Sequence, residues 1–94
     1  MIQSFACEET ERLFNDETAR RVPANLQRVA RRKLLMLHQA HSLNDLRVPP
    51  GNRLEALKAD RAGQHSIRIN DQYRICFRWQ GADAFAVEIV DYHR

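Results

Sequence analysis

The spacing of apolar residues changes along the chain, from a helical period in the first half to the two-residue period of strands in the second. Residues 1–6 alternate in the manner of a short strand. Residues 7–16 predict a short helix, because two glutamates suit its first turn and apolar residues follow. Between residues 26 and 40 apolar side chains recur at steps of three or four, which predicts a long amphipathic helix.

A Pro-Pro-Gly sequence at residues 49–51 ends the helical region, and alternating patterns follow it. Residues 65–70 and 73–79 predict two strands of a hairpin, and residues 84–90 predict another antiparallel strand. This order is typical of a small α+β domain, with two N-terminal helices packed on one face of a mainly antiparallel β-sheet. The length predicts one domain over residues 1–94.

Strand alternation also predicts which side chains share a face, because successive side chains point to opposite sides of a sheet. The apolar set expected to face the helices comprises Ile67, Ile69, Ile75, Phe77, Val87 and Ile89. Arg68, Arg74 and Arg78 then line the open face. Three arginines on neighbouring strands repel one another unless an anion is present, so we expect them to bind RNA phosphates, with three independently solvated arginines as the alternative.

The charge distribution supports a polyanionic partner. Residues 1–17 contain five acidic residues and one arginine, whereas residues 18–94 contain 14 basic and seven acidic residues. Of the 15 basic residues 13 are arginine, whose planar fork suits phosphate contacts, so nucleic acid is the leading candidate. A basic stripe on and before the predicted long helix could contact nucleic acid or simply be solvated. Its members are Arg20, Arg21, Arg28, Arg31 and Arg32.

Several other classes of protein are disfavoured by the sequence. It contains neither a signal-peptide pattern nor a stretch of membrane-spanning length, which predicts a cytoplasmic protein without membrane association. Cys7 and Cys76 lie far apart in apolar-patterned segments and are expected to be buried, reduced thiols. His38 and His41 have a spacing that can bind metal, but a clear third ligand does not accompany them, so we expect no metal or other cofactor.

The most distinctive chemistry lies at the end of the last predicted strand, in Asp91, Tyr92 and His93. Cleavage of RNA by its own 2′-OH needs a base, cations that stabilise charge on phosphorus, and an acid for the leaving oxygen. His93 can act as acid or base near neutral pH. Arg74 and Lys58 can clamp a phosphate, and Tyr92 can stack on a base or handle a second proton.

The sequence resembles the HigB toxins of the RelE/ParE superfamily. The resemblance rests on "MIQSF", on the "LxxLKxDRAGxxSIRIN" block at residues 54–70, on "QYRICFRW" at 72–79 and on "VEIVDYH" at 87–93. It implies a toxin of a type II toxin-antitoxin pair, acting as a ribosome-dependent endoribonuclease that cuts mRNA in the decoding site. It also implies a helix-turn-helix antitoxin of the HigA type as partner.

The resemblance implies a set of site residues as well. The positions that match functional positions of the family are Lys58, Arg74, Tyr92 and His93, with Asp91 beside them. Some members carry a histidine where this chain has Glu55. Either Glu55 supplies a proton-transfer group or that role is absent.

A different class remains open, namely a non-catalytic RNA-binding or gyrase-poisoning toxin of the same superfamily. His93 favours the nuclease, because binding alone explains arginines but not a titrating group beside them. For the antitoxin, either direct occlusion of the site or docking on the acidic N-terminal segment is conceivable. The charge of that segment favours remote docking through Glu8, Glu9, Glu11 and Glu17.

Overall fold

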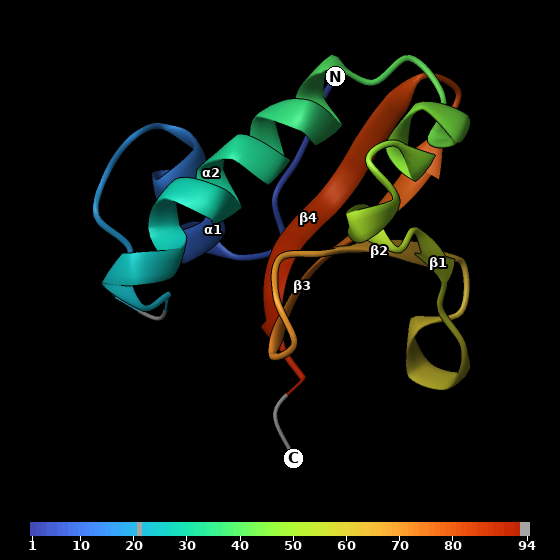
Figure 1. The fold of residues 1–94 in the computed structure, drawn as a ribbon. Coiled ribbons are helices and arrows are strands. Elements are labelled where there is room, and N and C mark those ends of the chain that lie inside the picture. Colours follow the sequence, from blue (N-terminus) through green and yellow to red (C-terminus); the bar gives the residue numbers. More distant parts are fainter. Residues whose placement is uncertain (21, 93–94) are drawn as a thin grey trace.

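The computed structural model describes residues 1–20 and 22–92 and confirms the predicted α+β architecture, with the helices on one side of the sheet (Figure 1). The two helices are α1 (Glu8–Phe14) and α2 (Ala24–Gln39). Four strands pair antiparallel in the order β1-β2-β3-β4: β1 (Glu55–Ala56), β2 (Gln64–Arg68), β3 (Tyr73–Gln80) and β4 (Asp83–Asp91). Three short 3₁₀ helices complete the fold. Two lie between α2 and β1, namely η1 (Leu43–Arg47) and η2 (Pro50–Asn52), and η3 (Ala59–Arg61) lies between β1 and β2.

The apolar core lies between the helices and one face of β3 and β4. Leu34 and Leu37 of α2 are fully buried, as are Ile75 and Phe77 of β3 and Val87 of β4. Burying a side chain of this size stabilises the fold by about 2 to 3 kcal/mol. The predicted parity of these apolar positions is therefore confirmed. No helix in the described part of the chain is long and apolar enough to span a membrane.

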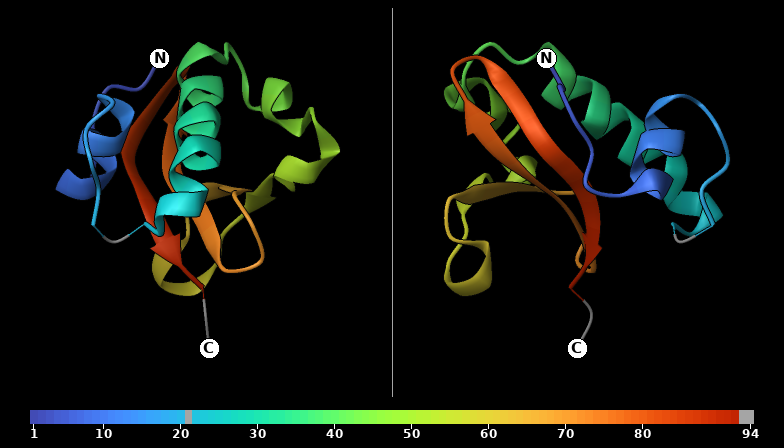
Figure 2. Two further views of the ribbon diagram at one scale, coloured as in Figure 1. Left: turned by 60° about the vertical axis from the view of Figure 1, so that its left-hand side comes forward. Right: turned by 180° about the vertical axis from the view of Figure 1, so that it is seen from behind.

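The N-terminal segment differs from the strand that the alternation of residues 1–6 predicts. It runs beside β4 and makes two isolated parallel bridges, between Ile2 and Ala84 and between Phe5 and Val87 (Figure 2). It does not form a regular strand, because β4 contains an irregularity at this point. The segment therefore borders the sheet without extending its regular ladder.

The irregularity is a β-bulge in β4. Cys76 pairs with Glu88 and Arg78 pairs with Phe85, so Ala86 and Val87 together lie opposite the single residue Phe77. Ala86 has a φ of 53°, and its amide donates to the Ser4 hydroxyl at 2.8 Å. The alternation predicted for residues 84–90 is therefore wrong at Phe85, which shares the face of Arg78. Beyond the bulge, Glu88 and Val90 occupy the open face.

A buried polar pair connects α2 to the two 3₁₀ helices that follow it. The ammonium group of Lys33 donates a hydrogen bond to the amide oxygen of Asn52, which is fully buried. The Asn52 amide nitrogen lies 3.1 Å from both the Leu46 carbonyl oxygen and the Met36 sulfur. Burial lowers the pKa of Lys33. This pair fixes η1 and η2, the two 3₁₀ helices that precede β1, against α2.

Candidate active site on the open sheet face

Arg74 is held in a defined orientation at the centre of the open face. Its Nε donates to the Ser66 hydroxyl at 2.7 Å, and its Nη2 donates to the Arg53 carbonyl oxygen at 2.7 Å. The side chain is 15% exposed, and Glu55 Oε1 lies 3.8 Å from Nη2. A guanidinium has five N–H donors, so these contacts fix its plane and leave donors for a phosphate oxygen. The structure thus brings Arg74 and Glu55 together.

Tyr92 follows β4 on the same face. Its amide donates to the Gln72 carbonyl oxygen at 2.6 Å, and its hydroxyl lies 3.6 Å from the sulfur of Cys76. Burial, followed by the hydrogen bond to Cys76, raises the pKa of Tyr92 to about 12. Burial also raises the pKa of the Cys76 thiol. Both groups are therefore neutral in the cellular pH range, so Tyr92 is a hydrogen-bond donor and Cys76 is not a reactive thiolate.

The contact between Cys76 and Tyr92 leads to a direct test. Replacing Cys76 by alanine removes one cause of the raised pKa of Tyr92, so that pKa should fall from about 12 towards its ordinary value of 10.0. Ultraviolet titration of the two tyrosines measures this change, with Tyr92→Phe used to assign the signal. Cys7→Ala is the matched control, because Cys7 lies beyond the opposite face of β4. An unchanged pKa in Cys76→Ala would show that the thiol does not interact with the phenol.

An ion pair that the sequence did not reveal crosses the same face. Arg61 of η3 donates from Nη2 to Glu88 Oε1 of β4 at 2.7 Å and from Nη1 to Gln64 Oε1 at 3.1 Å. The hydrogen bond to Glu88 raises the pKa of Arg61. The sequence "DRAG" at residues 60–63 is typical of a turn and gives no sign of a partner in β4. Pairing of Glu88 with Cys76 depends on the bulge, for which local sequence gives little signal.

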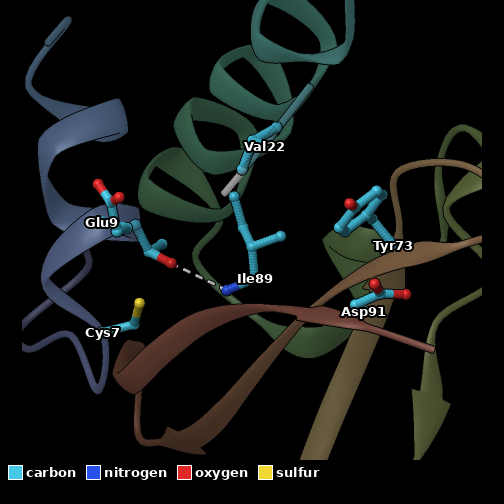
Figure 3. A pocket seen from close by; sticks show the side chains of 7 residues that line it. Cys7, Glu9, Val22, Tyr73, Ile89 and Asp91 are labelled. Carbon is cyan, nitrogen blue, oxygen red and sulfur yellow. Dashed lines mark hydrogen bonds between the residues drawn. The ribbon is translucent and has the colours of Figure 1, made fainter. Parts of the chain in front are cut away.

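The remaining predicted catalytic residues are placed differently. Lys58 is exposed and immediately precedes η3. Asp91 lies on the helix-covered face beside Tyr73, and its carboxylate accepts from the Gln72 amide at 3.2 Å (Figure 3). It borders a cavity of about 330 Å³ between α1 and β4. The structure therefore separates Asp91 from the open face, and His93 lies outside the described residues.

The predicted RNA-binding arginines fall into two groups. On the open face, Arg68 pairs with Asp71 and lies opposite Arg74 in the sheet, whereas Arg78 is exposed. On the helical side, Arg31 donates to the Leu13 carbonyl oxygen at 3.0 Å and lies 3.2 Å from Asp16. Arg31 thus ties α2 to the end of α1.

The other stripe residues include Arg20, Arg28 and Arg32, which are exposed. Arg21 lies outside the described residues. Within the described ranges, groups of three or more His, Cys, Asp or Glu residues that could hold a metal are absent. His38 instead accepts a hydrogen bond at Nδ1 from the Ile2 amide at 3.1 Å.

The small antiparallel sheet with helices on one face and an arginine and a phenol on the other agrees with a RelE-like toxin domain. The family model described as "RelE-like toxin of type II toxin-antitoxin system HigB" matches residues 3–93, and the chain belongs to this family. Membership implies an antitoxin partner.

Curated relatives agree with this assignment. The chain is 39% identical over 80 residues to "Toxin HigB-1" of Vibrio cholerae, covering 84% of each chain. It is 30% identical over 93 residues to "Endoribonuclease HigB" of Proteus vulgaris, covering 99% of this chain and 100% of the relative. An uncharacterized protein of Haemophilus influenzae is 41% identical over 64 residues, covering 68% of this chain and 63% of the relative.

Proposed function

We propose that this toxin is a ribosome-dependent endoribonuclease that acts as a single domain in the cytoplasm and cuts mRNA in the decoding site of the small ribosomal subunit. Two findings support the activity: the family to which the chain belongs, and the similarity to "Endoribonuclease HigB" of Proteus vulgaris. The observation that carries the proposal for this chain is the fixed guanidinium of Arg74 on the same face as the neutral phenol of Tyr92.

The proposed reaction needs neither a metal nor another cofactor. The 2′-oxygen loses its proton to a base and forms a bond to phosphorus, the bond to the 5′-oxygen breaks, and that oxygen takes up a proton. The products are a 2′,3′-cyclic phosphate and a 5′-hydroxyl. Arg74 stabilises the negative charge that develops on the phosphate oxygens, and Lys58 adds a second cation.

Three residues share the proton transfers in this proposal. Tyr92 is protonated throughout the cellular pH range, so it can donate a hydrogen bond to the phosphate or to the leaving oxygen. His93 is the candidate acid or base near neutral pH. Glu55 is half-exposed and its Oε1 lies 3.8 Å from Arg74, which places it beside the proposed phosphate site. It is the candidate proton acceptor at a position where some family members carry histidine. Asp91, on the opposite face, is assigned no contact with the RNA.

In this proposal the ribosome orients the RNA substrate. The described open face offers few groups that could orient a flexible single strand, whereas the decoding site presents mRNA in a fixed conformation. Arg20, Arg28 and Arg32 are exposed on the helical side and are the proposed contacts to the ribosomal RNA backbone. The toxin would thus bind rRNA with one side and mRNA with the other.

Cell-free translation tests this proposal. Added toxin should shorten the translated mRNA and leave 5′-hydroxyl ends, whereas the same RNA without ribosomes should remain intact. Ribosome binding should weaken steeply as salt is raised, because phosphate contacts release counterions. Efficient cleavage of naked RNA would contradict ribosome dependence. Inhibition of DNA supercoiling with intact mRNA would instead support a gyrase poison.

We further propose that a helix-turn-helix antitoxin of the HigA type docks on the acidic N-terminal side and leaves Arg74 uncovered. Glu8, Glu11 and Glu17 are exposed there and complement a basic DNA-binding partner. Glu9 is excluded from this surface, because its Oε1 accepts a hydrogen bond from the Arg20 amide at 3.2 Å. Inhibition then follows because the complex is too bulky to enter the ribosome.

A further inference from the structure

The ion pair between Arg61 and Glu88 joins η3, which lies between β1 and β2 in the chain, to the edge strand β4. Arg61 lies in η3, just after Lys58, and Glu88 lies in β4 beside Cys76. The side chains are 34% and 23% exposed, and the 2.7 Å separation is that of a charge-assisted hydrogen bond. Because both groups are partly shielded from water, this pair should hold its two side chains together more firmly than a fully solvated ion pair would.

This pair is the long-range hydrogen bond that ties the segment carrying Lys58 to β4. Among the described residues, the other hydrogen bonds of residues 57–63 stay within this segment or reach Gln64 at its end. The Leu57 amide donates to the Gln64 carbonyl oxygen at 2.9 Å, and the Arg61 amide donates to the Lys58 carbonyl oxygen at 3.1 Å. The backbone hydrogen bond from Arg61 to Lys58 therefore links the anchored residue to the one that carries the ammonium group.

We propose that the Arg61–Glu88 ion pair is a positioning contact that holds η3 against β4 and so fixes Lys58 at the open face. The inference rests on the proposed ribonuclease function. Arg61 itself is poorly suited to clamp a phosphate, since Glu88 offsets its charge and both of its Nη atoms make hydrogen bonds. Its effect on cleavage therefore passes through Lys58.

A mutant cycle on programmed ribosomes tests this proposal. Arg61→Gln and Glu88→Gln should each lower the cleavage rate by about 10- to 100-fold, the range expected when a reacting group is misplaced by about 1 Å. In a Lys58→Ala background, either substitution should cause little further loss, because the group that it positions is already absent. The charge swap Arg61→Glu with Glu88→Arg should recover part of the activity.

The matched control is Arg12→Gln, which breaks the 3.1 Å pair between Arg12 and Glu8 on the far side of the molecule. It should cleave at the parent rate. Fully additive losses of Arg61→Gln and Lys58→Ala would overturn the positioning role and indicate a direct contact between Arg61 and RNA. Parent-like cleavage by Arg61→Gln would overturn it as well.

Hydrogen exchange separates this inference from the proposed function. The Arg61 and Ala62 amides, which are hydrogen-bonded within η3, should exchange on the order of 10-fold faster in Arg61→Gln and Glu88→Gln than in the parent protein or in Arg12→Gln. Unchanged exchange would overturn the anchoring role whether or not the toxin cleaves RNA. If the parent leaves mRNA intact while exchange rises as expected, the ribonuclease proposal fails and the anchor stands.

Discussion

Arg74→Ala should reduce mRNA cleavage on programmed ribosomes by about 100- to 1,000-fold, the usual cost of removing one donor that stabilises charge in a transition state. The expected loss is large because Arg74 is already oriented by Ser66 and Arg53, so it needs no reorganisation when phosphate arrives. Arg74→Lys should recover only part of the rate, since an ammonium group cannot make the same forked contacts. Single-turnover cleavage rates provide the measurement.

Stability must be followed in the same variants, because Arg74→Ala leaves the buried hydroxyl of Ser66 without its partner. This loss should cost about 1 to 2 kcal/mol, which thermal unfolding would detect without abolishing the fold. Arg47→Ala is the matched control, since Arg47 is exposed in η1, away from the sheet. Near-parent cleavage by folded Arg74→Ala would remove the central residue from the proposed site.

Asn52→Leu should destabilise the protein by about 3 kcal/mol, the sum of an unpaired buried cation and an unpaired carbonyl group. The Lys33 ammonium would lose the amide oxygen that accepts its hydrogen bond, and the Leu46 carbonyl would lose its donor. For a domain of this size, that corresponds to a fall in melting temperature of roughly 12 to 24 °C. Urea unfolding with a constant m-value provides the measurement.

A double variant identifies the cause of this loss. Combining Lys33→Met with Asn52→Leu replaces the pair by apolar side chains, so most of the lost stability should return. If the double variant is as unstable as Asn52→Leu, packing and not the unpaired cation dominates. If Asn52→Leu unfolds like the parent, the buried hydrogen bonds contribute little to stability.

The sheet could be predicted from the sequence because alternation is a local property. Ile67, Ile75 and Phe77 define the helix-facing side, and the same parity places Arg74 on the open side. The alternation also separates Asp91 from Tyr92, as the structure shows, although both belong to one polar cluster in the sequence. For predicting whether two residues share a site, the face of the sheet on which each lies is therefore more informative than their closeness in the sequence.

The rest of the site depends on contacts between distant residues. Arg61 and Glu88 are 27 positions apart, and Lys33 and Asn52 are 19 apart, so no local pattern pairs them. Arg31 fits a basic stripe by its helical spacing, but the end of α1 provides it with partners that periodicity cannot reveal. The sequence therefore predicts on which face of a helix or sheet a side chain lies. It does not predict which charged side chains on that face already have partners.

The bulge at Ala86 makes the spacing of β4 as important as its composition. Deleting this one residue would restore a regular ladder without moving any side chain to the other face, because Phe85 would stay opposite Arg78 and Val87 opposite Phe77. Deleting a residue elsewhere in β4 would instead shift at least one side chain to the wrong face. Single-residue gaps in β4 among members of this family should therefore fall at the position of Ala86, where the loss is the hydrogen bond from the Ala86 amide to the Ser4 hydroxyl.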